Sequence, residues 1–263
     1  MFSVIRGGCF SRHPNGFIMQ RPNGLPYHVL LLIKSPAEII IDGKLHTCKP
    51  NSALFIRPNT PYSYRNPSGE YIDDWLHFTG NPEDVSCLPD SLFHHSFPVS
   101  NIRLLTTYIQ QILWENNFTN EEEKGYYVDS LFHILLRHIA EDFRNGTYTE
   151  YNPYQYKLQK IRLELSSAPY HKYTAKDFSD RLEISVSYFQ SLYKTLFGVS
   201  FQADIISMRV DYAKELIIST NLPLEQIAYS CGYSNEVHFY RQFLSKTGMT
   251  PGDYRKNYRI QLT

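Results

Sequence analysis

The chain has 263 residues, and its 26 basic and 26 acidic side chains leave no formal net charge. Hydrophobic residues make up 42% and charged residues 20%, a globular balance that excludes a strongly acidic or basic disordered chain. The longest clean apolar run, residues 29–33, is far shorter than the ~20 residues of a membrane-spanning helix. The first residues lack a signal-peptide pattern, so we expect a cytoplasmic protein with no membrane partner.

The cysteines and charges indicate how the chain is organised. Its four cysteines are scattered and form no C-x-x-C pair, so we expect reduced thiols rather than a disulfide framework or a zinc finger. Residues 1–153 carry 12 basic and 16 acidic side chains, whereas residues 154–263 carry 14 and 10. This asymmetry indicates two modules, of which only the second favours a polyanion.

Residues 1–95 have the pattern of a β-structure. Short apolar or β-branched runs, separated by turns rich in proline and glycine, occupy residues 27–33, 38–41, 44–47, 53–56, 62–64 and 73–78. The pair Asp42-Gly43 between two of these runs predicts a tight hairpin. Short strands at such regular spacing predict a small barrel or jelly roll.

Residues 96–145 predict a helical hairpin. In residues 102–118 and again in 121–143, apolar residues recur every three or four positions, so each segment has one apolar face. The two helices either only cover the barrel or also present a seam for a homodimer. The pattern breaks in residues 146–153, the predicted linker, and residues 154–263 are predicted to be helical.

Two weakly similar units lie within this helical part. Each ends in an aromatic-rich helix followed by a glycine, and these glycines, Gly198 and Gly248, are 50 residues apart. In the second unit, Gly232 separates a short helix from one that Ser234 or Asn235 caps. A short helix, a glycine turn and an exposed second helix predict a helix-turn-helix, whose second helix enters the major groove of DNA.

The motif residues extend over both units. The second unit contains Ile227-Ala228, Gly232-Tyr233, Phe239, Arg241, Phe243, Gly248, Thr250-Pro251 and Tyr254-Arg255. The first contains Ser185, Tyr188-Phe189, Tyr193-Lys194 and Phe197-Gly198, and the connecting helix contains Arg209, Ala213 and Leu216. With these residues the chain resembles the AraC/XylS family of bacterial transcription regulators over about a hundred residues. Leu244 departs from the family pattern, in which a lysine is usual.

This resemblance implies two recognition helices on one face, which enter adjacent major grooves of double-stranded DNA about 34 Å apart. Gln190 is suited to reading adenine, and Arg241 to reading guanine or binding phosphate. Lysines and Arg255 are suited to the DNA backbone. The predicted DNA-binding residues are Val186, Ser187, Gln190, Ser191, Lys194, Asn235, Glu236, Val237, His238, Arg241, Lys246 and Arg255.

The first half resembles the cupin-like sensor barrel of many AraC-type regulators, through residues 75–80 and the stretch from Ile56 to Tyr64. Cupin enzymes hold a metal with a His-x-His pair, which the histidines here do not form, so we expect no metal and no cofactor. Such a barrel suits a small polar effector, for example a sugar. Its candidate ligand-binding residues, each equally open to an ordinary core or surface role, are Arg12, His28, Tyr64, Trp75 and His77.

The sequence therefore predicts an α+β protein of two domains. The first is a cupin-like β-barrel or jelly roll with a two-helix hairpin, and the second is an all-α domain with two helix-turn-helix units. The predicted function is an effector-responsive, sequence-specific transcription activator in the bacterial cytoplasm, a homodimer with RNA polymerase as a further partner. We expect no enzyme activity, because no hydrolase, P-loop or dinucleotide motif is present. A cupin-type metalloenzyme and an architectural DNA binder remain alternatives.

Overall fold

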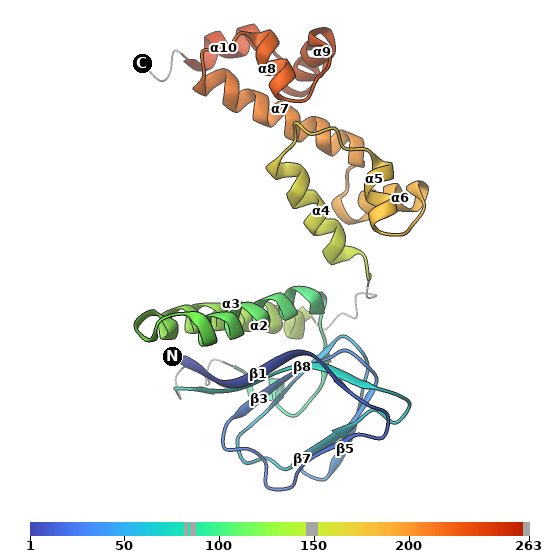
Figure 1. The fold of residues 1–263 in the computed structure, drawn as a ribbon, viewed down its shortest axis with the longest axis vertical. Coiled ribbons are helices and arrows are strands. Elements are labelled where there is room, and N and C mark those ends of the chain that lie inside the picture. The colour runs from blue at the N-terminus through green and yellow to red at the C-terminus, as the bar shows by residue number, and fades with distance from the viewer. Residues whose placement is uncertain (82–83, 85–87, 146–151, 260–263) are drawn as a thin grey trace. The chain divides into compact units, whose positions relative to one another are not determined.

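The computed structural model describes residues 1–81, 84, 88–145 and 152–259. The chain forms two compact units, Met1–Tyr151 and Asn152–Thr263, which are described separately below. The division lies within the predicted linker, most of which, residues 146–151, is outside the described residues. The protein is thus an α+β chain with a β-rich first unit and a helical second unit (Figure 1). Within the described residues, no helix is long and apolar enough to cross a membrane.

The first unit contains two antiparallel sheets. The five-stranded sheet has the order β1 (Phe2–His13), β8 (Tyr71–Gly80), β3 (His28–Ile33), β6 (Ser52–Ile56) and β9 (Phe97–Pro98). The four-stranded sheet has the order β2 (Ile18–Arg21), β7 (Tyr62–Arg65), β4 (Ala37–Ile41) and β5 (Lys44–Cys48). The larger sheet therefore extends past residue 95, because β9 pairs with β6.

The larger sheet is the middle layer of three. Leu30 and Leu32 of β3 belong to the core that this sheet shares with the helices. Leu31 of the same strand belongs to the core between the two sheets, together with Ile39 and Tyr64 of the smaller sheet. Because successive strand residues point to opposite faces, the part of a strand that is buried on both faces must be apolar, as residues 29–33 are.

The predicted hairpin at Asp42-Gly43 is confirmed. Both residues have positive φ, 48° and 76°, and they join β4 to β5 in the register Ile41 opposite Lys44. A turn with two positive φ values matches the twist of the flanking strands, and glycine adopts such a φ at little cost.

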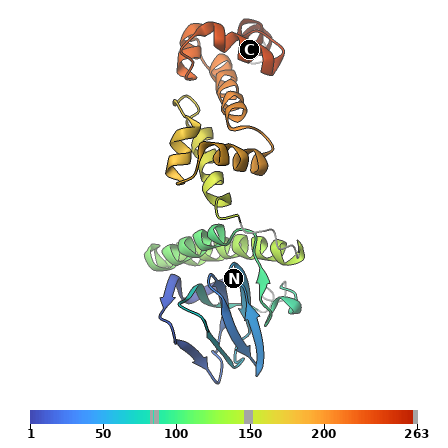
Figure 2. The ribbon, with the colours of Figure 1, turned by 90° about the vertical axis from the view of Figure 1, so that its right-hand side faces the viewer.

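The predicted helical hairpin is also confirmed, as α2 (Ile102–Phe118) and α3 (Glu121–Asn145). Asn101 caps α2 by accepting from the Leu104 amide. The apolar faces of both helices pack on the larger sheet, and Phe132 stacks on Phe2 at 4.8 Å between ring centres. In both Figure 1 and Figure 2 the hairpin lies across one face of the sheets.

The second unit contains seven described helices. They are α4 (Gln155–Ser167), α5 (Ala175–Arg181), α6 (Val186–Phe197), α7 (Phe201–Ser219), α8 (Leu224–Ser230), α9 (Glu236–Thr247) and α10 (Pro251–Arg259). Helix α7 belongs to two separate cores. Its first half, with Phe201 and Ile205, packs with α4, α5 and α6. Its second half, with Val210 and Ala213, packs with α8 and α9. Helix α7 therefore joins two small helical subdomains, the first around α4–α6 and the second around α8–α10.

Candidate functional site

Helices α5 and α6 form the first helix-turn-helix. The α6 N-terminus is capped by Ser185, whose hydroxyl accepts from the Tyr188 amide at 3.2 Å. Phe189 and Tyr193, one helical turn apart, are fully buried and hold α6 against the core. Gly198, with φ 72°, ends the helix in the left-handed conformation that favours glycine.

Helices α8 and α9 repeat this construction. Asn235, rather than Ser234, caps α9: its Oδ1 accepts from the Val237 amide at 2.7 Å. Phe239 and Phe243 are fully buried, and Gly248, with φ 74°, ends the helix. Gly232, between the two helices, has φ 81°, in the left-handed region that favours glycine. In both subdomains the second helix of the helix-turn-helix, α6 or α9, is therefore held by two aromatic rings on one face. The opposite face of the helix points outward.

Most of the predicted DNA-binding side chains are on these outward faces. The exposed ones are Val186, Ser187, Gln190, Ser191 and Lys194 on α6, and Val237, His238, Arg241 and Lys246 on α9, with Asn235 just before it. Val237 is 65% exposed, unusually high for an apolar side chain, and Val186 is 39% exposed. The outward face of each helix therefore offers an apolar side chain beside its polar ones.

Three predicted residues already have partners within the unit. The Asn235 oxygen is engaged in the α9 cap. Glu236 is half-buried and lies close to the Tyr240 hydroxyl, whose pKa is raised by burial and by this carboxylate. Arg255 is half-buried, and its Nη2 donates to the Leu222 carbonyl at 2.7 Å. Arg255 therefore holds α10 against the loop before α8, and a phosphate contact would compete with this bond.

A buried carboxylate connects three helices of the first subdomain through hydrogen bonds, and sequence reasoning did not predict it. Asp204 on α7 is 6% exposed. Its Oδ2 accepts from Arg162 Nε of α4 and from the Tyr193 hydroxyl of α6, both at 2.8 Å. The Arg162 Nη2 donates to Oδ1 at 3.3 Å. This network fixes the position of α6 relative to its neighbours.

The segment between α4 and α5 contacts the second subdomain. Arg209 of α7 donates to the carbonyls of Pro169 and His171, both at 2.9 Å. Gly232 lies so close to Tyr170 that an added Cβ would be 2.4 Å from the Tyr170 carbonyl oxygen. The turn of the second helix-turn-helix is therefore closely packed against this segment.

The first unit has a cavity of about 220 Å³ between its two sheets. It is lined by Arg6, His13, Met19, Arg21, Leu31, Tyr62, Tyr64, Trp75 and His77. Three of the predicted effector-binding residues, Tyr64, Trp75 and His77, are thus brought together around one cavity. Trp75 and His77 are adjacent, with 4.7 Å between ring centres, as expected for alternate residues of β8.

The other two predicted residues do not line this cavity. Arg12 is exposed, and its Nη1 donates to Glu70 Oε2 at 3.1 Å. The His28 ring stacks on Phe78, 5.2 Å between ring centres, and so lies on the sheet face that the helices cover. Both placements have the same cause: adjacent strand residues face opposite sides of the sheet, so each placement depends on a register that the sequence pattern did not provide.

The cavity is lined by two positively charged side chains, Arg6 and Arg21, and by no carboxylate among the described residues. Burial, followed by the positive charges of Arg21 and Arg6, lowers the pKa of His77 to about 4. Its imidazole is therefore neutral at pH 7. Burial also raises the pKa of the Tyr62 hydroxyl to about 12. The wall thus offers two guanidinium groups together with neutral imidazole and phenol groups, and all of these can donate hydrogen bonds.

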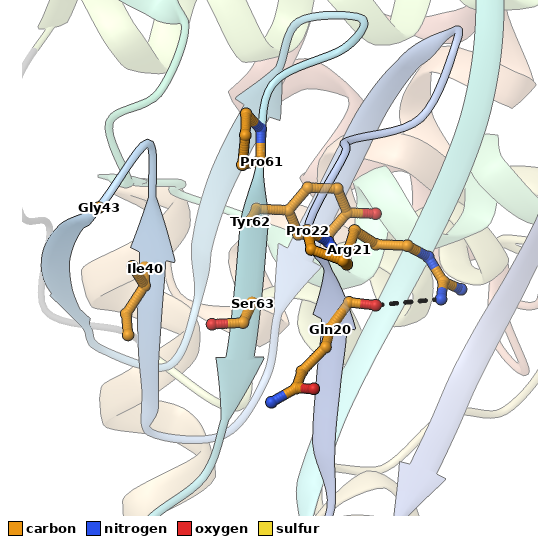
Figure 3. Close-up of a pocket in the computed structure, with 8 residues that line it drawn as sticks. All are labelled: Gln20, Arg21, Pro22, Ile40, Gly43, Pro61, Tyr62 and Ser63. Atoms are coloured by element: carbon orange, nitrogen blue, oxygen red, sulfur yellow. Dashed lines mark hydrogen bonds between the residues drawn. The ribbon is translucent and has the colours of Figure 1, made fainter.

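A second depression, of about 310 Å³, lies on the outer face of the smaller sheet (Figure 3). Gln20, Ser63 and Ile40 from three neighbouring strands line it. Figure 3 shows the Arg21 side chain extending away from Ile40 and Ser63, with its Nη1 donating to the Gln20 carbonyl at 3.3 Å. Within the described residues, no group of three His, Cys, Asp or Glu side chains is arranged to hold a metal ion.

Asp73 is buried in the core of the first unit, and burial raises its pKa to about 7. Replacing it with asparagine is expected to stabilise this unit more and more as the pH rises from about 4 to 7. The folded form alone binds the proton in this window, so the stability of the unchanged protein falls as the pH rises. The rise of the Asp73 pKa from its ordinary value of 3.8 corresponds to a loss of unfolding free energy on the order of 4 kcal/mol across this pH range. The asparagine variant does not have this loss.

Tryptophan fluorescence during denaturant unfolding measures this effect, because both tryptophans, Trp75 and Trp114, belong to the first unit. The matched control is Asp42→Asn, at an exposed turn position. The difference in unfolding free energy between this control and the unchanged protein is expected to change far less between pH 5 and pH 8 than that of Asp73→Asn. An equally flat difference for Asp73→Asn would contradict the assignment.

Residues 178–257 match a protein family described as a helix-turn-helix domain. The activator RclR of Escherichia coli (strain K12) is 27% identical over 103 residues, 39% of this chain and 36% of that protein. The raffinose operon regulatory protein RafR of Pediococcus pentosaceus is 26% identical over 145 residues, 55% of this chain and 51% of that protein. The matches thus span about a third to a half of these relatives. The structure of a probable AraC family regulator from Rhodopseudomonas palustris CGA009 matches 39% of this chain and 96% of that chain, with 21% identity and a TM-score of 0.36.

Proposed function

We propose, from the premise that residues 178–257 belong to the AraC family of helix-turn-helix domains, that the protein is a DNA-binding transcription regulator. One observation carries the proposal. Helices α6 and α9 are built alike and packed on the two halves of α7, and each keeps its polar face exposed. In this role they would enter two adjacent major grooves of one duplex.

The exposed side chains suit different parts of DNA. Gln190 can form two hydrogen bonds with adenine, and Arg241 can do so with guanine. Val186 and Val237 would contact thymine methyl groups, the apolar feature of the major groove. Lys194 lies in the last turn of α6 and would bind phosphate. Lys246 lies in the last turn of α9 and would also bind phosphate. Base contacts would set the sequence preference, and phosphate contacts the affinity and salt dependence.

The first unit would act as a cupin-like sensor for a small polar effector such as a sugar. Its cavity combines aromatic rings with hydrogen-bond donors, a lining suited to a polar ring compound. The name of RafR, which refers to the raffinose operon, supports a sugar as one candidate. An effector that binds one arrangement of the protein better would shift the population toward it, and activation of transcription is the outcome we propose.

The outer faces of α2 and α3 support a homodimer. They expose large apolar side chains, including Trp114 at 60%, Phe118 at 71% and Tyr126 at 65%. Monomeric proteins seldom leave such a group uncovered, and a second copy would bury it. A dimer would double the number of DNA half-sites. RNA polymerase, in the bacterial cytoplasm, would then be the partner of the DNA-bound regulator.

Selection of bound duplexes from a random library, with the full chain as bait, tests the proposal. We expect enrichment of one sequence pattern, and an affinity for it that falls steeply as salt is raised. Binding that is equally strong to all duplexes would contradict a sequence-specific regulator and favour an architectural DNA binder. Absence of binding at low salt would contradict both.

Removing the base-reading side chains should weaken binding selectively. For Gln190→Ala and Arg241→Ala, we expect a roughly 5- to 150-fold loss of affinity for the enriched duplex, because each bidentate base contact contributes about 1–3 kcal/mol. Fluorescence anisotropy with a labelled duplex measures the loss. The control Lys157→Ala removes an exposed charge on α4, outside both recognition helices, and should change affinity less than threefold. Equal losses in all three variants would contradict the assigned roles.

A further inference from the structure

The cavity between the sheets holds more positive charge than a neutral sugar requires. We propose that its ligand is a small anion, with a carboxylate or phosphate group held by Arg6 and Arg21 and a ring held against Trp75 and Tyr64. This inference rests on the proposed effector role of the same cavity, and it replaces a neutral polar ligand with a negatively charged one.

The arginines of the sheet region divide into two groups. Three of them have carboxylate partners: Arg12 with Glu70, Arg57 with Asp90, and Arg65 with Glu38. The other two, Arg6 and Arg21, both line the cavity, and neither has an ion pair within the described part of the chain. The unpaired guanidinium groups are therefore the ones at the cavity.

Arg21 has an unmet hydrogen-bond donor. Its Nε is buried and has no hydrogen-bond partner among the described residues. Its Nη1 donates a long bond, 3.3 Å, to the neighbouring Gln20 carbonyl, and its guanidinium group also interacts with the Tyr62 hydroxyl. Burying a polar group of a charged side chain without a partner is costly, and a bound anion would supply the missing acceptor.

The positive charges of Arg6 and Arg21 both act on His77 in the cavity wall. Both lower the pKa of His77, so both guanidinium groups act on the same part of the cavity wall. Arg6 also lies over the Trp75 ring, 5.9 Å from its centre. Asp73, the buried acid on the same strand, has a pKa raised to about 7 and does not line the cavity. Among the described residues that line the cavity there is therefore no carboxylate to balance the arginines.

The size of the cavity limits the ligand. A volume of about 220 Å³ equals that of about seven water molecules in the liquid. This is room for a small ligand such as one ring with one charged group. The Tyr64 and Trp75 rings on the wall supply the flat apolar surface that such a ring would contact.

Matched pairs of probes test the charge requirement. Isothermal titration calorimetry of the full chain would compare glucuronate and glucose 6-phosphate with glucose, and benzoate with benzamide. We expect at least one anion to bind at least tenfold more tightly than its neutral counterpart. The comparison of glucuronate with glucose 6-phosphate distinguishes a carboxylate ligand from a phosphate ligand.

Arginine variants locate the binding site. Arg21→Gln and Arg6→Gln are each expected to lower the affinity for the bound anion at least tenfold. The matched control is Arg65→Gln, which removes an exposed arginine of β7 outside the cavity and should leave the affinity unchanged. Thermal melting of each variant, without ligand, confirms that it folds.

The outcomes separate this inference from the proposed function. If glucose or benzamide binds as tightly as its charged counterpart, the anion requirement is overturned, and the effector role of the cavity stands. If the anion affinity is unchanged in Arg21→Gln and Arg6→Gln, the assigned site is wrong. If no probe binds, the anion inference is overturned together with the effector role, whereas DNA binding is measured independently.

Discussion

Replacing Asp204 with alanine is expected to lower the free energy of unfolding of the second unit by about 3–5 kcal/mol. The change removes the common acceptor of Arg162 and Tyr193. It leaves the hydroxyl of Tyr193, a fully buried side chain, without that acceptor, and it opens a space where three helices meet. Since Tyr193 belongs to α6, the same change should also weaken DNA binding through a misplaced recognition helix.

Denaturant unfolding followed by far-ultraviolet circular dichroism measures this loss, with tryptophan fluorescence identifying the transition of the first unit. The matched control is Asp211→Ala on the same helix, which removes an exposed ion pair with Lys214 at 2.7 Å and should cost less than about 0.5 kcal/mol. Asp204→Asn keeps an acceptor oxygen and should lie between the two. A loss for Asp204→Ala as small as that of the control would contradict the role of the network.

Replacing Gly232 with alanine is expected to cost about 2–4 kcal/mol and to reduce DNA binding. Two penalties combine at this position. Its φ of 81° disfavours any side chain, and a Cβ would lie 2.4 Å from the Tyr170 carbonyl oxygen. Because the obstacle is backbone, either the turn between α8 and α9 or the segment containing Tyr170 would have to move.

Gly248→Ala is the matched control for this prediction. Gly248 has a similar φ, 74°, but a Cβ there would have no atom within 4 Å, so only the conformational cost of about 1 kcal/mol remains. The same unfolding experiment measures both variants. Equal losses would show that the contact with Tyr170 contributes nothing, and that the φ value alone explains the effect.

The second unit could be predicted from local signals. The caps at Ser185 and Asn235 and the glycines at 198, 232 and 248 are short-range features, and each is visible in the sequence beside its helix. The spacing of buried aromatic residues then indicates which face of each helix is free. What the sequence could not provide is the partner of Asp204, because Arg162 lies 42 residues away and on another helix.

The first unit was harder to predict, because its cavity depends on strand register. The first predicted strand began at residue 27, whereas the structure has two strands before it, β1 and β2. The register of β1 against β8 shifts between Val4 and Arg6 and again between Gly8 and Ser11, which hides the alternation that a regular strand would show. The cavity residues Arg6 and Arg21 lie on these two strands and were therefore missed.

The central claim, that α6 and α9 read one duplex together, is tested most directly by repeating the duplex selection with Gln190→Ala and Arg241→Ala. Each variant is expected to lose its preference at a different group of bases, and the two groups should lie about one helical turn, 10 base pairs, apart. If either variant keeps the full preference of the unchanged protein, or if both lose it at the same bases, the two helices do not read adjacent grooves and the account is wrong.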